Sequence, residues 1–397
     1  MNRIEKLLQK LCPEGVEFKA LGEVCNALPK GTLKQQQLQN EGYPVINSGR
    51  ELYGYYSQFN NEGNAIVVTS HGAYAGFTHY LQGKFWAGGL CYPYRSKNEN
   101  ELLTKFIFYY CKDKNKIIKS FVAEGSIPYI NKSLLDKLKI PIPPLEIQKE
   151  IVLILDAFTE LQAELQAELQ ARQKQYEHYR ERLLSFEELV SRSGGGGELV
   201  KMMSLGEVCQ CFAGGTPKTD RVEFWDNGTI SWMSSGEVNK GTIYETEKKI
   251  TQLGFDKSST KMIPPNAVVL ALAGQGKTRG MVARTKISLC TNQSLCAIVP
   301  NETINYSFLY FYLKNQYMQL RQISAGDGTR GGLNLKMVEN FQIPIPPLKV
   351  QNEVVEILDK FDALVNDISQ GLPAEITARK KQYEHYREKL LSFKEKA

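Results

Sequence analysis

Metal-binding patterns are missing from this sequence. No Cys-x-x-Cys pair occurs, and the four histidines form no group with the spacing of metal ligands. Among the eight cysteines, Cys209 and Cys211 are separated by one residue, and Cys290 and Cys296 by five. Such irregular spacing favours reduced, mostly buried thiols over a disulfide framework. We therefore expect no metal site.

Long apolar runs are absent as well. No stretch approaches the roughly 20 apolar residues of a membrane-spanning helix. The N-terminal segment MNRIEKLLQKLCPEG is charged and lacks the apolar centre of a signal peptide. These absences predict a cytoplasmic protein with no membrane partner.

Catalytic motifs are also lacking. The sequence has no Gly-x-Ser-x-Gly, no helicase motifs, and no Asn-Pro-Pro-Tyr or Asn-Pro-Pro-Phe string of a methyltransferase. We predict no catalytic residue in this chain. What is present is a mild basic excess, a net charge of +6 over 397 residues. The length predicts two or more domains, and the charge fits a nucleic-acid partner.

One pattern occurs twice along the chain. The hexapeptide IPIPPL stands at 140–145 and again at 343–348. The heptapeptide KQYEHYR stands at 174–180 and again at 381–387. Self-similarity over such a long period indicates a tandem duplication, in which a globular half and a long helix are each repeated.

The duplication sets the expected domain boundaries. A further repeated string, LGEVC at 21–25 and 205–209, lies near the start of each globular half. Short strands and helices with no regular βαβ alternation predict an α+β fold for each half. The expected order is an N-terminal helix (1–17), a first globular domain (18–140), a central helix (141–192), a Gly-rich linker (193–202), a second globular domain (203–343) and a C-terminal helical region (344–397).

Local patterns predict several elements within these halves. Apolar and β-branched runs bounded by turn residues predict strands at 43–46, 65–69, 229–233 and 268–272. Aromatic-rich helices are expected at 102–121 and at 308–320, the first with a basic end formed by Lys114, Lys116 and Lys119.

The segment after Pro144 has the apolar spacing of a coiled coil. Intervals of four and three residues alternate through Ile147, Ile151, Ile154, Phe158, Leu161 and Leu165, which is a heptad seam. The next apolar residue is Leu169, four residues on, which makes a stutter, and the seam resumes at Tyr176, Tyr179, Leu183 and Phe186. A continuous helix from Leu145 to Glu188 would be about 66 Å long at ~1.5 Å per residue.

The second copy has a similar seam before Gly371 and Pro373 interrupt it, formed by Val350, Val354, Ile357, Phe361, Leu364 and Ile368. We expect the long helices to pack as an antiparallel coiled coil, the spacer of a pseudo-two-fold symmetric molecule. The repeated tyrosines of KQYEHYR either pack in this seam or form two similar surfaces that bind two copies of one partner, and these roles are compatible. They are Tyr176, Tyr179, Tyr383 and Tyr386.

A glycine-rich loop in the second half allows several interpretations. The string ALAGQGKT at 271–278 ends like a phosphate-binding loop, but alanine replaces the first required glycine. The residues from Arg279 to Ala283 also favour a strand over the required helix. A nucleotide hydrolase using Lys277 and Thr278 is therefore kept as an alternative. The other interpretations are a loop that holds phosphates and reads base edges, and a plain hairpin turn.

These motifs in combination resemble the DNA-specificity subunit of type I restriction–modification systems. The resemblance covers nearly the whole chain. It rests on the duplicated IPIPPL followed by Gln148 or Gln351, the KQYEHYR helices, GGTP at 214–217 and AGQGKTRG at 273–280. It implies two target-recognition domains held at a fixed separation by an antiparallel coiled coil, and a subunit with no catalytic activity.

The resemblance also implies partners and their cofactors. The target would be a bipartite double-stranded DNA sequence, with one half-site for each domain. Two modification subunits would methylate adenine with S-adenosylmethionine, and restriction subunits would use ATP and Mg. No cofactor is expected in this chain. An orphan scaffold that no longer reads DNA is a further alternative.

The residues expected to contact DNA differ between the halves, because the first half lacks both the GGTP and the AGQGKTRG strings. Its corresponding loop, 69–76, offers other side chains. In the first half we predict Lys30, Lys34, Arg50, His71 and Tyr74. In the second half we predict Thr216, Lys218, Gln275, Lys277, Thr278, Arg279 and Arg330.

Overall fold

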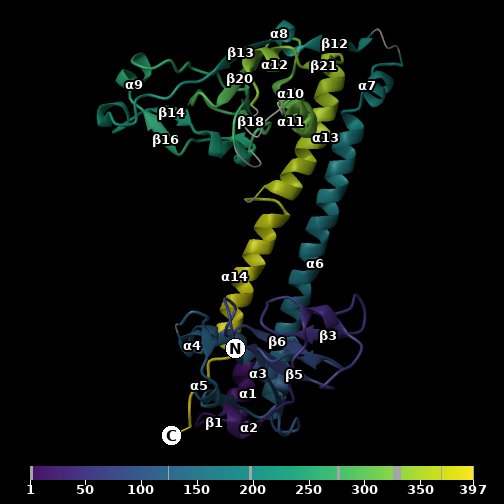
Figure 1. Ribbon diagram of the computed structural model, residues 1–397, viewed down its shortest axis with the longest axis vertical. Coiled ribbons are helices and arrows are strands. Elements are labelled where there is room, and N and C mark those ends of the chain that lie inside the picture. Colours follow the sequence, from purple (N-terminus) through teal and green to yellow (C-terminus); the bar gives the residue numbers. More distant parts are fainter. Residues whose placement is uncertain are drawn as a thin grey trace. The chain divides into compact units, whose positions relative to one another are not determined.

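The computed structural model describes residues 3–123, 125–195, 199–274, 278–324, 332–367 and 369–396. The chain divides into two compact units, each combining sheets with helices. Unit 1 contains Met1–Ala167 and Glu375–Ala397, and unit 2 contains Glu168–Ala374. Unit 1 is therefore built from both ends of the chain (Figure 1).

Unit 1 begins with α1 (Arg3–Leu11), β1 (Glu17–Ala20), α2 (Leu21–Val24), β2 (Cys25–Ala27), η1 (Gln35–Gln37), β3 (Tyr43–Ile46), β4 (Gly54–Tyr56), β5 (Ala65–Thr69), β6 (Thr78–Leu81), β7 (Trp86–Ala87) and β8 (Cys91–Ser96). It continues with α3 (Thr104–Asp113), α4 (Asn115–Ser120), β9 (Val122–Ala123), β10 (Tyr129–Ile130), α5 (Lys132–Asp136), β11 (Lys139–Ile142) and the first part of α6 (Leu145–Leu183). Most of α14 (Leu372–Leu390) also belongs to this unit.

Unit 2 contains the end of α6, then α7 (Phe186–Arg192), β12 (Lys201–Ser204), α8 (Leu205–Val208), β13 (Cys209–Ala213), η3 (Val222–Phe224), β14 (Ile230–Met233), η4 (Ser235–Lys240), β15 (Thr242–Ile243), β16 (Lys248–Ile250) and α9 (Gln252–Asp256). It continues with β17 (Val268–Ala271), β18 (Val282–Thr285), β19 (Cys290–Thr291), β20 (Leu295–Pro300), α10 (Tyr306–Asn315), α11 (Tyr317–Ile323), α12 (Leu335–Glu339), β21 (Gln342–Ile345) and α13 (Leu348–Asn366).

The sheets of the two units follow the same strand order, except that the main sheet of unit 2 has one further strand, β15. The main sheet is β2-β8-β5-β6 in unit 1 and β13-β20-β17-β18-β15 in unit 2. The smaller sheet is β4-β3-β7 in unit 1 and β16-β14-β19 in unit 2, each with one parallel pair. The duplication and the α+β class expected from the sequence are both present.

The repeated IPIPPL string forms a strand and then starts a long helix. In unit 1, β11 pairs antiparallel with β1, and in unit 2, β21 pairs antiparallel with β12. Each strand contains the first proline of the string, Pro141 or Pro344, and ends before the Pro-Pro pair, since proline has no N–H to donate to a ladder. The carbonyl of Pro144 then accepts from Ile147 N (2.9 Å), and α6 begins.

A buried glutamine fastens the start of each long helix to its globular domain. Gln148 is fully buried and bonds to Leu103 N (2.8 Å), Glu101 O (2.8 Å) and Pro143 O (2.7 Å). The equivalent Gln351 bonds to the matching backbone atoms of unit 2, which are Asn305 N (2.8 Å), Thr303 O (3.0 Å) and Pro346 O (2.8 Å). We call each of these arrangements a glutamine latch. Each latch satisfies a buried amide with three hydrogen bonds.

The central helix is shorter than the sequence suggested. Helix α6 ends at Leu183, and a separate helix, α7, begins at Phe186. The break occurs because Ser185 caps α7, its hydroxyl accepting from Glu188 N (3.3 Å). The helix is therefore not continuous to Glu188, and the central helix expected over 141–192 is divided in two. The placement of Phe186 in a buried seam is wrong, since its side chain is 42% exposed.

The buried register of the long helices also differs from a simple heptad. Ile147, Ile151 and Leu155 are fully buried, whereas the predicted Ile154 is only half-buried. In unit 2, Leu358 is buried and Ile357 half-buried, so the same shift occurs twice. The reason lies in the packing of unit 1: Ile147, Ile151 and Leu155 share one buried cluster with α3 and with α14. A helix contacted by two elements buries a wider face than a coiled-coil seam.

Three other helices differ from the expectation. Helix α1 stops at Leu11 instead of continuing to 17, because Pro13 and Gly15 (φ 114°) follow. The aromatic helix expected at 102–121 is split into α3 and α4 where the backbone leaves helical geometry at Lys114 (φ −83°, ψ 20°). In unit 2 the split between α10 and α11 falls at Gln316 (φ −88°, ψ 15°).

Other expectations are confirmed. Strands β3 and β5 have the predicted bounds, and β14 and β17 agree within one residue. The second rod is interrupted between α13 and α14 at Gly371. Glycine is required there because a Cβ would lie 2.7 Å from Leu364 O.

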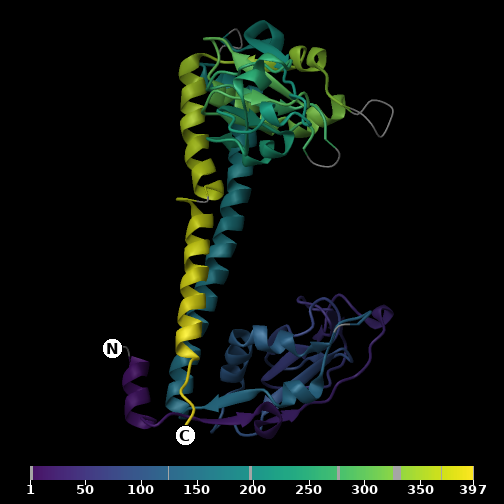
Figure 2. The same cartoon turned by 90° about the vertical axis from the view of Figure 1, so that its left-hand side faces the viewer.

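The two ends of the chain meet within unit 1. Val16 N donates to Lys394 O (2.9 Å), and Lys396 N donates to Val16 O (2.9 Å). Lys389 Nζ also lies 3.0 Å from Glu5 Oε1. Figure 2 shows α1 beside the C-terminal end of the chain.

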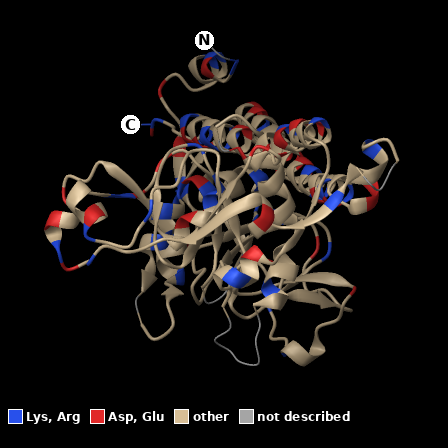
Figure 3. Cartoon of the chain, turned by 90° about the horizontal axis from the view of Figure 1, so that it is seen from above, with Lys and Arg blue, Asp and Glu red and all other residues tan. Residues whose placement is uncertain are grey.

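The cysteines are free, and six of the eight are buried, in agreement with the prediction. Lys, Arg, Asp and Glu are interspersed along the helices (Figure 3). In the described part of the chain, no helix has both the length and the apolar character needed to cross a membrane. The same residues contain no group of three or more metal-ligating side chains. In the expected Gly-rich linker, Gly194 and Gly195 are described, and 196–198 lie outside the described residues.

Candidate nucleic-acid interface

Two loops of unit 2 leave the main sheet at the same end. Strand β20 lies between β13 and β17, with Ala213 paired to Cys296 and Ala271 paired to Leu295. Both neighbours therefore end beside the start of β20. The GGTP segment follows β13, and the glycine-rich loop follows β17, so the sheet brings these two predicted motifs together.

The GGTP segment is held tightly against the smaller sheet. Gly215 N donates to Thr291 O (2.8 Å), and Trp232 Nε1 donates to Gly215 O (3.0 Å). A Cβ at Gly215 would lie 2.5 Å from Thr260 N, so only glycine fits. The hydroxyl of Thr216 donates to Gln293 Oε1, and Lys218 is exposed. The glycines thus build the turn, and Thr216 and Lys218 occupy its surface.

Unit 1 contains the same turn with a different sequence. Gly31 N donates to Ala87 O (2.9 Å), which is the counterpart of the bond from Gly215 to Thr291. The segment KGTLK at 30–34 therefore occupies the place of GGTPK at 214–218. Lys34 corresponds to Lys218, both of which were predicted. Thr32, which corresponds to Thr216, was missed, although it lies as far beyond the first LGEVC as Thr216 beyond the second.

Lys30 serves the fold of this turn. Its ammonium donates to Gly89 O (3.1 Å) and Cys91 O (3.4 Å) and lies 4.8 Å from the ring centroid of Tyr92. Lys34, in contrast, is exposed, and its hydrogen bonds are made by its backbone: its N–H donates to Gln37 Oε1 (2.9 Å) and its carbonyl accepts from Gln37 N (2.9 Å). Of these two predicted contacts, Lys34 has the freer ammonium for a DNA phosphate.

The loop between β5 and β6 groups the remaining predicted residues of unit 1. Tyr74 is 43% exposed, and the guanidinium of Arg50 lies 5.0 Å from its ring centroid. His71 accepts or donates a hydrogen bond with Ser70 Oγ (2.8 Å) and stacks on Tyr129 at 6.0 Å. Tyr129 is 44% exposed and was not predicted, because it enters from the distant strand β10. Exposed aromatic and Arg faces of this kind are suited to contacts with bases and sugars.

The equivalent loop of unit 2 is a hairpin. Strands β17 and β18 are antiparallel, and Gly280 (φ 83°) donates its N–H to Ala271 O (2.9 Å). A phosphate-binding loop requires a helix at this position. Since a turn and strand β18 follow, the structure contradicts the nucleotide-hydrolase alternative, and the strand begins at Val282, later than expected.

Part of this predicted surface is not described. Thr278 and Arg279 are half-buried at the base of the hairpin. Gln275, Lys277 and Arg330 lie outside the described residues. Gln293, which bonds to Thr216, was missed, because the pairing of β20 with β13 and β17 that places it there is non-local.

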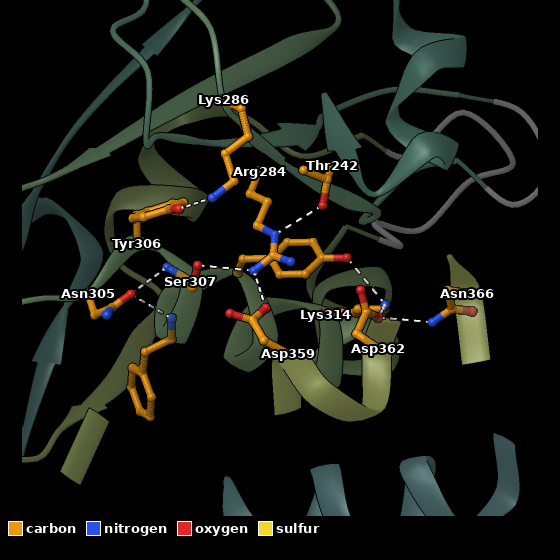
Figure 4. Close-up of polar contacts among 12 residues, drawn as sticks. Thr242, Arg284, Lys286, Asn305, Tyr306, Ser307, Lys314, Asp359, Asp362 and Asn366 are labelled. Atoms are coloured by element: carbon orange, nitrogen blue, oxygen red, sulfur yellow. Dashed lines mark hydrogen bonds and ion pairs between the residues drawn. The ribbon is translucent and has the colours of Figure 1, made fainter. Parts of the chain in front are cut away.

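Basic residues deeper in unit 2 are paired and belong to the scaffold (Figure 4). Arg284 of β18 contacts Asp359 of α13 at 2.6 Å and donates to Ser307 Oγ (3.0 Å). Lys314 of α10 lies 3.3 Å from Asp362 Oδ1. These ion pairs fasten the domain to α13.

The repeated tyrosines pack in the helix seams. In unit 2, Tyr176 is buried, its hydroxyl donates to Asp362 Oδ1 (3.1 Å), and burial raises its pKa to about 12. Tyr179 stacks on Phe361 at 5.3 Å. In unit 1, Tyr383 is buried, and Tyr386 stacks on Phe158 at 5.6 Å while remaining 37% exposed. Seam packing is confirmed, and their role in binding a partner stays a prediction.

A duplicated α+β domain with exposed polar, basic and aromatic loops at one end of each sheet is the architecture of a binding protein. A family model described as the type I restriction modification DNA specificity domain matches residues 13–172 and 197–378. The chain belongs to this family of type I restriction–modification specificity subunits.

Individual relatives agree with this assignment. A type I restriction enzyme specificity subunit of Escherichia coli is 34% identical over 415 residues, which cover 99% of this chain and 97% of that protein. A protein of Haemophilus influenzae with a corresponding name is 30% identical, covering 98% of each chain. The crystal structure of a type I S subunit from M. genitalium has the same fold, with a TM-score of 0.65, 19% identity, and coverage of 95% and 96% of the two chains.

Proposed function

We propose that this chain reads a bipartite double-stranded DNA target, one half-site through each globular domain, as the specificity subunit of a type I restriction–modification complex. One observation carries the proposal. Both units present equivalent turns and loops at the same end of the main sheet, but the side chains differ, as with KGTLK against GGTPK. A shared backbone frame with different exposed side chains is suited to reading two different sequences.

The chemistry would reside in partner subunits. Two modification subunits would methylate adenine with S-adenosylmethionine, and restriction subunits would use ATP and Mg to act on unmethylated DNA. The exposed face of Tyr386 and the half-buried Tyr179, at equivalent places in the repeat, are proposed as parts of two similar partner surfaces. The chain would contribute recognition and assembly, with no catalytic residue and no cofactor of its own.

The decisive experiment is a base-resolution map of adenine methylation in host DNA with and without this gene. We expect one gapped, two-part motif to lose methylation when the gene is deleted. Replacing residues 18–140 with the first domain of another specificity subunit should then change one half of the motif and leave the other intact. If no motif is lost, this chain does not direct methylation.

The stutter in α6 allows a second test. The buried residues Leu165 and Leu169 begin successive LQAE and LQ units within the helix. Deleting residues 165–168 removes one unit, which shortens a helix by about 6 Å and turns it by about 40°. At about 3.4 Å per base pair, the gap in the methylated motif should shrink by one or two base pairs. An unchanged gap would show that this helix does not set the spacing.

A further inference from the structure

A basic cleft lies in unit 1 beside the loop between β5 and β6. Its volume is about 680 Å³. One wall is formed by Arg50 and Tyr74, a second by the segment from Lys112 to Lys119 at the end of α3 and in α4, and a third by α14 around Arg387. Two of the residues already predicted to contact DNA therefore face the same cavity as the basic end of the aromatic helix.

The cleft carries more positive than negative charge. Its lining includes six basic residues and three acidic ones. Asp113, whose side chain is 6% exposed, forms ion pairs with Lys114 (2.9 Å) and Arg387 (3.4 Å). The two other carboxylates, Glu384 and Glu388, are on exposed positions of α14. An anion entering the cleft would therefore meet an excess of cations.

Lys112 is a half-buried cation of the cleft that has no counterion among the described residues. It lies over the rings of Phe108 (5.3 Å) and Tyr383 (5.8 Å), and no hydrogen bond or ion pair of its ammonium occurs among the described residues. Burial and the neighbouring Arg387 lower its pKa. A half-buried ammonium without an anionic partner is costly, so such a group is commonly matched by a ligand or a paired charge.

Unit 2 contains an equivalent lysine whose charge is matched by neighbouring side chains. Lys314 is the counterpart of Lys112 and lies over Tyr176 as Lys112 lies over Tyr383. In unit 2, however, Lys314 contacts Asp362 (3.3 Å) and Tyr310 Oη (3.2 Å) (Figure 4). In unit 1 the corresponding residues are Thr159 and Phe108, so the carboxylate is replaced by a neutral hydroxyl that donates to Leu155 O (2.8 Å), and the phenol by a plain ring.

We propose that the cleft of unit 1 holds a backbone phosphate of the DNA whose half-site the first domain reads, with Lys112 and Arg50 as its cationic ligands. This inference rests on the proposed function. A phosphate supplies the negative charge that Asp362 supplies in unit 2, and Lys and Arg are the side chains that bind phosphates. The position beside Arg50 and Tyr74 favours DNA over a partner's carboxylate, because Tyr74 belongs to the β5–β6 loop that is predicted to contact DNA and Arg50 packs on its ring.

The test uses the full chain assembled with its modification subunits and measures binding to a cognate and a scrambled duplex over a range of salt concentrations. Two variants should prevent the cleft from binding a phosphate, each by a different change of charge. K112Q removes the cation, and T159D installs the carboxylate found in unit 2. T159N is the matched neutral control for T159D. Thermal unfolding checks that all variants are folded.

We expect K112Q and T159D to weaken binding to both duplexes by about tenfold. The slope of log K against log salt should become shallower by about 1, the value for one lost phosphate contact. T159N should behave like the unchanged protein. Replacing single DNA phosphates by neutral methylphosphonates should reveal one position whose neutralisation weakens the unchanged protein but not K112Q.

Three results would overturn the proposal. The first is a slope that K112Q and T159D leave unchanged. The second is an effect of T159N equal to that of T159D. The third is weaker assembly with modification subunits in the absence of DNA, which would place a partner's carboxylate in the cleft. Failure of the proposed function is distinguishable, because the unchanged protein would then not prefer the cognate duplex. If both hold, K112Q should weaken binding without changing which motif the assembled complex prefers.

Discussion

Units 1 and 2 share their backbone frame and differ in the charges that the frame surrounds. The glutamine latches of Gln148 and Gln351 make the same three bonds, and Gly31 and Gly215 donate to equivalent carbonyls. Around Lys112 and Lys314, in contrast, one unit lacks the carboxylate that the other has. The bonds that recur build the fold, and the positions that vary are those available for recognition.

The largest losses of stability should come from substituting the fully buried leucines at equivalent positions of α6 and α13. We expect Leu155→Ala in unit 1 and Leu358→Ala in unit 2 each to lower the free energy of unfolding by about 2–5 kcal/mol, because both leucines are fully buried. Urea unfolding with hydrogen exchange would measure the loss and locate it. The control is Leu153→Ala, at a position that is 65% exposed, where a change within about 0.5 kcal/mol is expected. A larger loss at Leu153 would contradict the observed register.

The glutamine latches should show equal but smaller losses. Gln148→Leu and Gln351→Leu would each leave Leu103 N or Asn305 N without its acceptor, at a cost of about 2–3 kcal/mol. Exposed Gln173 of α6 provides a control for the same substitution. Equal losses in both units, measured by urea unfolding, would confirm that the latch is a duplicated structural device. A loss at one latch alone would break the equivalence.

The two lysines should respond oppositely to pH. Burial lowers the pKa of Lys314, but Tyr310, Tyr176 and Asp362 outweigh this and raise it above 10.5. The pKa of Lys112 is lowered below 10.5. Lys314 therefore adds stability at pH below 10.5, and this stability is lost as pH rises through its raised pKa. Lys112 costs stability at pH below its lowered pKa, and the cost disappears as pH rises towards 10.5.

At neutral pH we therefore expect Asp362→Thr to destabilise the protein by about 1–2 kcal/mol, between the values of exposed and buried ion pairs. Lys112→Met should stabilise it. Both differences from the unchanged protein should diminish as pH is raised, and unfolding midpoints measured in urea across this range would show it. Destabilisation by Lys112→Met at neutral pH would mean that Lys112 has a partner within the fold.

The sequence predicts the duplication and several strands because their signals are local. The run at 65–69 is apolar, is followed by Gly72 and Gly76 with positive φ, and forms β5 with the predicted bounds. The heptad pattern predicted the wrong buried residue, Ile154 in place of Leu155, because the sequence does not show that α3 and α14 both pack on α6. Caps were also missed: Ser185 ends the central rod through one side-chain bond.

Residues of the candidate interface were predictable where their distance from a repeated string identifies them. They were not predictable where the pairing of distant strands places them. Lys34 and Lys218 are predicted from their charge, and their equivalence follows from their equal distance from the two LGEVC strings, which also predicts Thr32. Tyr129 reaches His71 only through the pairing of distant segments. The missing counterion of Lys112 could be recognised only once the structure showed that Asp362 pairs with Lys314, because Thr159 is the residue equivalent to Asp362.

The meeting of the two chain ends within unit 1 has a consequence for biosynthesis. Leu390 and Leu391 belong to the same buried cluster as Ile147 and Ile151, yet roughly 200 residues separate the two segments of this unit. At about 5–20 residues per second, the ribosome needs about 10–40 s to produce the intervening chain. Throughout that interval the apolar face of α6 lacks part of its cover, while every residue of unit 2 is being made. The domain encoded first is thus completed last, and a message truncated before α14 leaves it unfinished.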